Sequence, residues 1–329
     1  MSIIVLGAGA VGCFIAGKLA RAGVDVTVVA RGPALAAIAD RGITVSGEQD
    51  FQTDVRSMTA DNTEPAEVVI SCIKAHSIPD AARTVARLLK PHGMWVCVQN
   101  GIPWWYTHGL TGPLQGVTLE SVDPGGGIAA AVPHERTAGA VVYARCETTS
   151  PGEIVYKGGK GLILGEINGP VSSRVRAFAD LLQSAGLNCA TTDDIRSAVW
   201  SKLFGNVSMN PLTAITGLTM GNLVAEPRLA AFAVATIEEA QQVAIAAGSK
   251  PDMTPEARVK AMALLTDFRT SMLQDASAGR LLELDAILAA PVEIARRLRV
   301  PVPGLELLLA MTSAFAETRG LRPAQRAAT

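Results

Sequence analysis

The stretch Ile3-Ile4-Val5-Leu6-Gly7-Ala8-Gly9-Ala10-Val11-Gly12 decides how the first half of this 329-residue chain folds. Its four apolar residues predict a buried strand, and a helical pattern over residues 11–22 continues from the GxGxxG motif. In a strand–turn–helix unit, such glycines allow a tight turn, a close approach of the backbone to a pyrophosphate, and close packing of the helix on the strand. We therefore expect a dinucleotide-binding turn formed by Gly7, Ala8, Gly9, Ala10, Val11 and Gly12.

The end of the second predicted strand, Val26–Ala30, indicates which dinucleotide is bound. An NAD site usually has a carboxylate ~20 residues past the glycines, bonded to a ribose hydroxyl. Here the strand runs into Arg31, whose guanidinium suits a 2′-phosphate through charge-assisted hydrogen bonds; the alternative is a solvated surface arginine. Lys74, just past the predicted strand Val68–Ile73, is a candidate second positive group. We expect NADP(H) rather than NAD(H) as the cofactor.

Apolar runs alternate with helical patterns through the first hundred residues, which predicts a parallel sheet covered by helices on both faces. The strand Trp95–Val98 leads to Asn100-Gly101. Ligands in such sheets lie beyond the carboxyl ends of the strands, so Asn100 either contacts the nicotinamide end or the substrate, or belongs to a simple Asn-Gly turn. Glycine-rich residues 118–166 indicate an additional antiparallel portion that completes the sheet.

After residue 190 the pattern is helical almost to the end of the chain. The predicted helices cover Ile195–Asn210, Leu223–Ala247, Thr254–Leu273, Leu282–Leu298 and Gly304–Thr318. The sequence therefore predicts an α/β protein with two domains. Residues 1–190 form an N-terminal Rossmann-type doubly wound sheet that binds NADP(H), and residues 191–329 form an all-α C-terminal domain that binds the substrate; residues 322–329 are predicted to be a polar tail.

The composition excludes several classes of partner. Hydrophobic residues make up 49% of the chain and its formal net charge is −1, with no lysine or arginine block, which argues against nucleic acid and anionic membranes. The start of the chain lacks the features of a signal peptide, and the five cysteines include no CxxC pair, so we expect free thiols in a reducing cytoplasm. The four histidines lack metal-ligand spacing, so no metal is expected. A homodimer is left open.

A polar stripe runs along the first helix of the second half. Lys202, Asn206 and Asn210 are four residues apart, so at ~100° per residue they stay within about 80° of one another. Their neighbours are mostly apolar, and a buried lysine or asparagine without a partner costs about 1–3 kcal/mol. A cleft that holds a polar ligand would supply those partners, and burial would lower the pKa of the lysine toward that of a useful proton donor. The alternative is a solvent-facing stripe.

Two later segments carry candidate partners for this stripe. Residues 270–275 are predicted to end one helix and include Ser271. Glu283 and Asp285 lie near the start of the next helix, and because they are two residues apart they cannot face the same way. One of them is expected to point toward the cleft while the other forms a cap or an ion pair. The sequence does not decide between them.

Taken together, these segments resemble the ketopantoate reductase (2-dehydropantoate 2-reductase) family over nearly the whole chain. The matching pieces are, in order, Gly7–Gly12, Arg31, Cys72-Ile73-Lys74, Gln99-Asn100-Gly101, Lys202 with Asn206 and Asn210-Pro211-Leu212-Thr213-Ala214, Ser271–Asp275, and Glu283-Leu284-Asp285. No single piece is specific, but their order and spacing are. The resemblance implies the NADPH-dependent reduction of a 2-oxo acid to a 2-hydroxy acid, most simply ketopantoate to pantoate in pantothenate biosynthesis.

The resemblance also implies roles for individual residues. The lysine that matches Lys202 acts as general acid, and the residue that matches Glu283 lies near it and holds the substrate hydroxyl. The remaining matches bind either the substrate oxygens (Asn206, Asn210, Ser271), the cofactor (Arg31, Lys74), or both the nicotinamide end and the substrate (Asn100).

This chain also departs from the family pattern. Leu282 replaces a threonine, Leu288-Ala289 occupies the place of an Asn-Gly pair, and Met220 stands where an asparagine is common. These changes predict a more apolar pocket, so one alternative is a paralogue that reduces another branched or aryl 2-oxo acid. A β-hydroxyacid dehydrogenase shares the fold plan and the lysine–asparagine spacing. A non-catalytic NADP(H) sensor is the third alternative, although it would not need Lys202 and Glu283 together.

Overall fold

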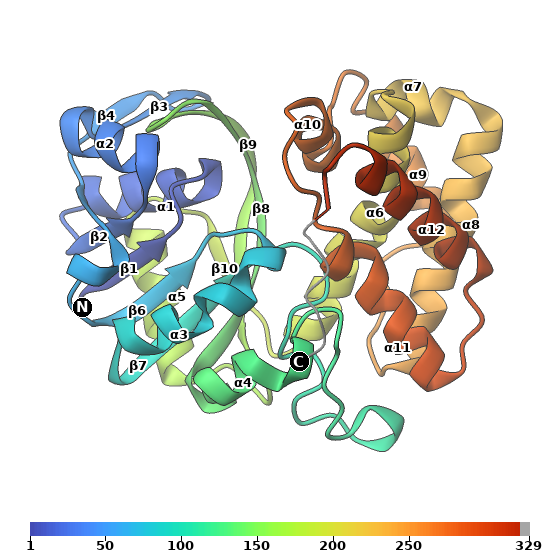
Figure 1. Cartoon of the computed structure of the whole chain (residues 1–329), viewed down its shortest axis with the longest axis horizontal. Coiled ribbons are helices and arrows are strands. Elements are labelled where there is room, and N and C mark those ends of the chain that lie inside the picture. The colour runs from blue at the N-terminus through green and yellow to red at the C-terminus, as the bar shows by residue number, and fades with distance from the viewer. Residues whose placement is uncertain (323–329) are drawn as a thin grey trace. The chain divides into compact units, whose positions relative to one another are not determined.

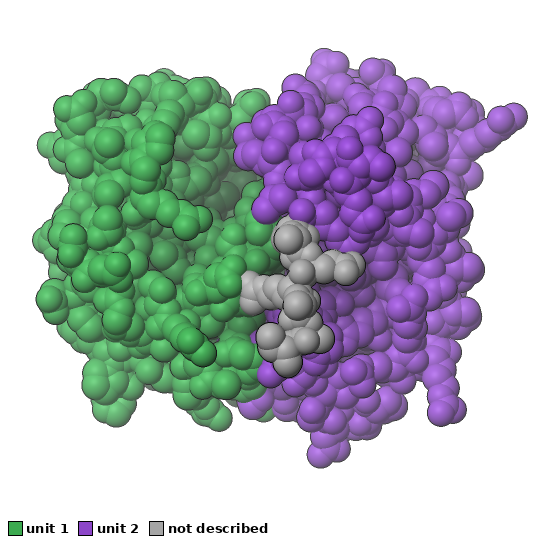
Figure 2. Space-filling view, in the orientation of Figure 1, with its two compact units in different colours: residues 1–99, 126–195 green, residues 100–125, 196–329 purple. Residues whose placement is uncertain are grey.

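A computed structural model describes residues 1–322 of the chain. The chain folds into two compact units, shown in different colours in Figure 2. The first unit contains Met1–Gln99 and Gly126–Ile195, and the second contains Asn100–Gly125 and the residues from Arg196 onward. The expected boundary at residue 190 lies five residues before the break at Ile195. Asn100–Gly125, which we expected in the nucleotide-binding domain, belongs to the helical unit instead.

The first unit is built on one sheet, which has ten strands in the described part of the chain and the order β4-β3-β9-β8-β7-β6-β1-β2-β5, with β10 beside β9. The strands are β1 (Ile3–Leu6), β2 (Val26–Val29), β3 (Ile43–Gly47), β4 (Phe51–Thr53), β5 (Arg56–Met58), β6 (Ala66–Ser71), β7 (Leu89–Val98), β8 (Thr137–Ser150), β9 (Glu153–Glu166) and β10 (Cys189–Thr191). Strands β8 to β5 along this order are all parallel to their neighbours, and β8 pairs with β9 antiparallel. The expected parallel sheet with an antiparallel addition is confirmed.

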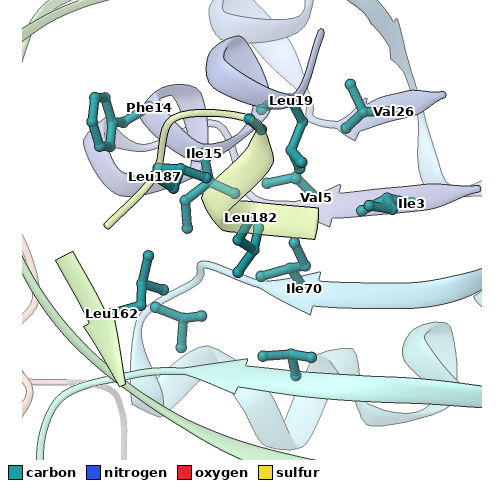
Figure 3. Packing of buried hydrophobic residues seen from close by; sticks show 14 of the residues in the cluster. Ile3, Val5, Phe14, Ile15, Leu19, Val26, Ile70, Leu162, Leu182 and Leu187 are labelled. Carbon is teal, nitrogen blue, oxygen red and sulfur yellow. The ribbon is translucent and has the colours of Figure 1, made fainter. Parts of the chain in front are cut away.

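Helices cover both faces of this sheet because alternate strand residues are buried on opposite sides. The helices of the unit are α1 (Ala10–Arg21), α2 (Gly32–Arg41), α3 (Ile78–Leu88), α4 (Gly127–Ala131) and α5 (Ser173–Ser184). Val5 and Ile70 belong to a buried cluster with side chains of α1 and α5, and Figure 3 shows Ile15 and Leu182 packed among them. The alternate residue Val69 is equally buried, on the face where α3 packs against β6 and β7.

The carboxyl ends of the three central strands are level with one another. Leu6 at the end of β1 pairs with Val29 of β2 on one side and with Ser71 of β6 on the other. The Gly7 N–H donates to Val29 O at 3.0 Å, and the Cys72 N–H donates to Leu6 O at 2.8 Å, so all three chains leave the sheet at the same height. The loops that follow β1, β2 and β6 therefore emerge side by side at the edge where doubly wound sheets bind their ligands.

The second unit is helical (Figure 1). Its helices are α6 (Ile195–Thr216), α7 (Met220–Ala225), α8 (Pro227–Ala246), α9 (Pro255–Ala263), α10 (Ser271–Ser277), the π-helical turn η6 (Asp285–Ala289), α11 (Ala290–Leu298) and α12 (Pro303–Thr318). Within the described residues, α8 is the one helix whose length and composition would suit a membrane span. It packs against α7, α9, α11 and α12, as a core helix of this unit does.

Two of the predicted helices are each divided in the structure. The expected Leu223–Ala247 helix is interrupted because Glu226 caps α8, accepting a hydrogen bond from the Arg228 N–H, and Pro227 fills the first turn. The expected Thr254–Leu273 helix ends at Ala263. Thr270 then caps the N-terminus of α10, so residues 271–275 begin a short helix rather than end a long one.

The segment Asn100–Gly125 is held to the helices of its unit by one fully buried hydrogen bond and by part-buried ones. The Trp200 Nε1–H donates to the Tyr106 hydroxyl at 2.7 Å, and neither residue is exposed to solvent. Arg196 on α6 donates to Tyr106 O at 2.7 Å, and at the other end of the segment Glu293 accepts a hydrogen bond from the Ser121 N–H at 3.0 Å. Tyr106 therefore has a packing role that ties this segment to α6, and Ser121 ties the segment to α11.

We predict that Tyr106→Phe lowers the free energy of unfolding by about 1–3 kcal/mol, because the buried Trp200 indole N–H loses its acceptor. Urea unfolding followed by tryptophan fluorescence measures the change. Tyr156→Phe in the first unit is the matched control, since within residues 1–322 its hydroxyl forms no hydrogen bond and its ring simply stacks on Phe14. Equal stability changes for the two variants would contradict this role of the buried hydroxyl.

Candidate active site

The glycine turn after β1 has the geometry of a phosphate cradle. Gly7 has a φ of +108°, and a Cβ on Gly12 would lie 2.0 Å from Gly7 O, so both positions exclude a side chain. A Cβ on Gly9, by contrast, would meet no atom within 4 Å. The turn is thus tight where it packs and open at Gly9, the N-cap residue of α1, where amides at the helix N-terminus favour an anion. These residues fit a dinucleotide pyrophosphate.

The two candidate phosphate ligands lie on the loops beside this turn. Arg31 is exposed and immediately precedes α2, two residues after the end of β2. Lys74 is half-buried and lies three residues after the end of β6. Because β2 and β6 flank β1 and end level with it, Arg31 emerges on one side of the glycine turn and Lys74 on the other. Their side chains are long enough to approach a nucleotide held there.

The polar stripe of the second unit lies on α6, as expected. Lys202 and Asn206 are half-buried and Asn210 is only 4% exposed. The helix is otherwise apolar around them: Leu203 and Val207, for example, are at most 1% exposed. The stripe is therefore largely withdrawn from solvent and is not a solvent-facing surface.

Two opposing effects set the pKa of Lys202. Burial lowers the pKa of the Lys202 ammonium to about 8, because removing the charge from water disfavours it, and the nearby Glu283 carboxylate partly offsets this by favouring the charged form. Glu283 is itself 6% exposed. A lysine with a pKa near neutrality can exchange its proton readily, which suits a general acid or base.

The structure also distinguishes the two acidic residues between which the sequence could not decide. Glu283 is the carboxylate that acts on Lys202. Asp285 is less buried and pairs with Arg322, with 3.7 Å between its Oδ1 and the guanidinium. A third acid, Asp275 on α10, is 5% exposed and pairs with Arg280 at 2.9 Å.

Two buried amide groups in this unit call for a ligand. The Asn210 Nδ2 finds no acceptor among residues 1–322, and the Asn100 Oδ1 finds no donor among them. Each such group costs about 1–3 kcal/mol when buried and unsatisfied. A ligand with both acceptor and donor atoms, such as a carboxylate next to a hydroxyl, would satisfy both.

A pair of hydroxyls that the sequence did not single out fixes α10 against α6. Thr213 Oγ1 lies 2.7 Å from Thr270 Oγ1, and both residues are at most 1% exposed. Thr270 is the N-cap of α10 and Thr213 lies one turn beyond Asn210, so the contact joins the start of α10, where the exposed Ser271 lies, to the helix that carries the stripe. The only signal in the sequence was the Asn-Pro-Leu-Thr segment, whose threonine has no obvious role in isolation.

Three of the four residues at which this chain departs from the family pattern are buried in the helical unit, and Ala289 is half-buried. Met220, Leu282 and Leu288 are 5%, 1% and 0% exposed. The Leu282 N–H donates to Leu321 O at 2.8 Å, which fixes the approach of the chain to Glu283.

Models of two protein families match the two halves of the chain. Residues 3–169 match the family described as "Ketopantoate reductase PanE/ApbA", and residues 194–316 match its C-terminal family, "Ketopantoate reductase PanE/ApbA C terminal". The chain belongs to the ketopantoate reductase family. The recognition made from the sequence is thereby confirmed.

Individual relatives support this membership over the full length. The chain is 39% identical to a 2-dehydropantoate 2-reductase of Mesorhizobium japonicum over 97% of this chain and 99% of that protein. A crystal structure titled as a putative ketopantoate reductase from Ralstonia solanacearum MolK2 superposes with a TM-score of 0.92 at 37% identity, covering 97% and 99% of the two chains. D-mandelate dehydrogenase with NADH and anilino(oxo)acetate shares the fold, with a TM-score of 0.82 over 98% of this chain and all of that one, at 20% identity.

For this member of the ketopantoate reductase family, we predict that the Lys202 amine titrates with a pKa of about 8. Glu283→Gln should lower that pKa further, because the carboxylate that favours the ammonium is lost. The NMR shift of ¹³C-methylated lysines followed against pH measures it, with Lys202→Met identifying the signal.

Asp285→Asn is the matched control for this titration, since Asp285 pairs with Arg322 and should leave the Lys202 pKa unchanged. If the pKa of Lys202 responds to Asp285→Asn and not to Glu283→Gln, then Asp285, and not Glu283, is the carboxylate that acts on Lys202.

Proposed function

We propose that this protein is an NADPH-dependent 2-oxo acid reductase that converts ketopantoate to pantoate. The observation that carries the proposal is the placement of Lys202 on an apolar helix near the buried Glu283, where burial lowers the pKa of the lysine to about 8. Membership of the ketopantoate reductase family adds the reaction, and the phosphate-cradle geometry after β1 adds the class of cofactor. A sensor that binds NADP(H) without turnover would have no use for this acid–base pair.

In the proposed reaction the bound nicotinamide supplies a hydride to the keto carbon of the substrate. Lys202 donates its proton to the keto oxygen as negative charge develops there, and the product is a 2-hydroxy acid. Glu283 keeps enough of Lys202 protonated near neutral pH and accepts a hydrogen bond from a substrate hydroxyl. Asn206, Asn210 and Ser271 donate to the substrate oxygens, and Asn100 contacts both the substrate and the nicotinamide end.

We assign NADP(H) rather than NAD(H) because of the charges around the glycine turn. The loop after β2 offers the guanidinium of Arg31 where NAD-binding proteins usually have a carboxylate. Lys74 on the other side of β1 adds a second cation, for which the 2′-phosphate is a suitable partner. The free thiols of all five cysteines agree with a cytoplasmic location.

The deciding experiment follows NADPH oxidation by the purified protein against a panel of 2-oxo acids that includes ketopantoate, branched-chain 2-oxo acids and an aryl 2-oxo acid. We predict the highest kcat/KM with ketopantoate, and a loss of at least about 100-fold in kcat for Lys202→Ala with NADPH binding retained. A different preferred acid would indicate a paralogous reductase. Near-normal turnover by Lys202→Ala would remove the general-acid role.

The cofactor assignment has its own test. Arg31→Ser should weaken NADPH binding by about 10- to 100-fold, since a charge-assisted hydrogen bond is worth roughly 1.5–3 kcal/mol, and should leave NADH binding almost unchanged. Fluorescence titration of both dinucleotides measures this. Arg41→Ser is the matched control, because Arg41 lies at the C-terminal end of α2, the helix that Arg31 precedes, and pairs with Glu153. Equal losses for NADPH and NADH would contradict a contact with the 2′-phosphate.

A further inference from the structure

The π-helical turn η6 leaves one carbonyl without a partner in its own helix. In this turn the Ala290 N–H donates to Asp285 O, five residues back, instead of to Ala286 O. The corresponding π-type donor for Ala286 O would be residue 291, which is Pro291 and carries no N–H. Within the described residues 285–298, the helix therefore offers no amide to Ala286 O.

The loop that carries Asn100 supplies the missing donor. The Ile102 N–H donates to Ala286 O at 2.8 Å, and Ile102 is fully buried. Such a close approach needs Gly101 between them: its φ is +81°, and a Cβ there would lie 2.4 Å from both the carbonyl carbon and the oxygen of Ala286. The Asn-Gly pair is thus more than a turn, because its glycine lets the backbone of one segment dock on the backbone of the other.

We propose that Gly101 is a positioning residue: the docking of Gly101 and Ile102 on the Ala286 carbonyl, which Pro291 keeps available, holds Asn100 in register with Glu283. Asn100 directly precedes the docked glycine, and Glu283 lies three residues before the accepting carbonyl. This inference rests on the proposed function, in which both side chains contact the substrate. It explains why the helix that follows Glu283 departs from regular α geometry at this point.

The test compares two glycines of the same loop. Gly101→Ala places a methyl group against Ala286, whereas Gly116 has a similar φ of +67° and open space around it, so Gly116→Ala imposes the backbone strain alone. We expect Gly101→Ala to lower kcat on the order of 10- to 100-fold, as misplacement of a reacting group does, with the dissociation constant for NADPH unchanged. Gly116→Ala should keep kcat within about twofold of the wild type.

A second variant and a second measurement keep the test decisive if Gly101→Ala folds poorly. Pro291→Ala restores an N–H that competes with Ile102 for Ala286 O, so kcat should fall in this variant too, with the dissociation constant for NADPH unchanged. Hydrogen exchange of the Ile102 amide should be slow in the wild type and in Gly116→Ala, and fast in Gly101→Ala and Pro291→Ala.

The outcomes are distinguishable. If kcat falls equally in Gly101→Ala and Gly116→Ala, or if Pro291→Ala leaves both kcat and the exchange rate unchanged, the positioning role is wrong. If the wild-type protein reduces no 2-oxo acid, the proposed function fails, while the exchange rate of Ile102 still decides whether the loop is anchored on Ala286.

Discussion

The burial of one ammonium group is the constraint on which the helical unit depends. Lys202 lies on a helix whose neighbouring side chains are almost all withdrawn from water, and this burial lowers its pKa to about 8. A charge in such surroundings is unfavourable unless a carboxylate or polar groups compensate for it. Glu283 provides that compensation from a distant part of the chain, and the π-helical turn next to it provides the free carbonyl on which the Asn100 loop docks. The same short segment, residues 283–291, thus supplies both the carboxylate that favours the Lys202 ammonium and the carbonyl that anchors the Asn100 loop.

The sequence predicted the nucleotide-binding half well because its signals are local. The strand Ile3–Leu6 and its glycine turn are read from consecutive residues, and each flanking strand is a short, mostly apolar run. The strands over residues 43–58 were not predicted, since they are only three to five residues long and partly exposed: β4 and β5 have three residues each, and the alternation of β3 lasts only from Ile43 to Ser46. In the helical half, periodicity continued through Glu226 and past Ala263, and only the caps at Glu226 and Thr270 reveal where the helices are divided.

The candidate site shows the same difference between local and long-range information. The stripe of Lys202, Asn206 and Asn210 follows from the helix repeat alone. The choice between Glu283 and Asp285 could not be made from the sequence, because it depends on Arg322, which neutralises Asp285 from the end of the described chain. The roles of Gly101 and Pro291 could not be predicted from the sequence either. Glycine is common in turns and proline at the start of helices, and the joint effect of these two residues appears only where their segments meet at Ala286.

The position of Asn100 in the chain decides which unit carries it. The strand that precedes it belongs to the sheet of the first unit, yet the chain crosses into the helical unit immediately after Gln99. From there, Ile102 is bound to Ala286, Tyr106 to Trp200 and Ser121 to Glu293, so the segment is fixed to three helical elements of that unit. Asn100, Lys202 and Glu283 therefore all belong to the same compact unit. The residues to which the proposed reaction assigns proton donation and substrate binding thus belong to the helical unit, and the glycine turn that fits a dinucleotide pyrophosphate belongs to the other.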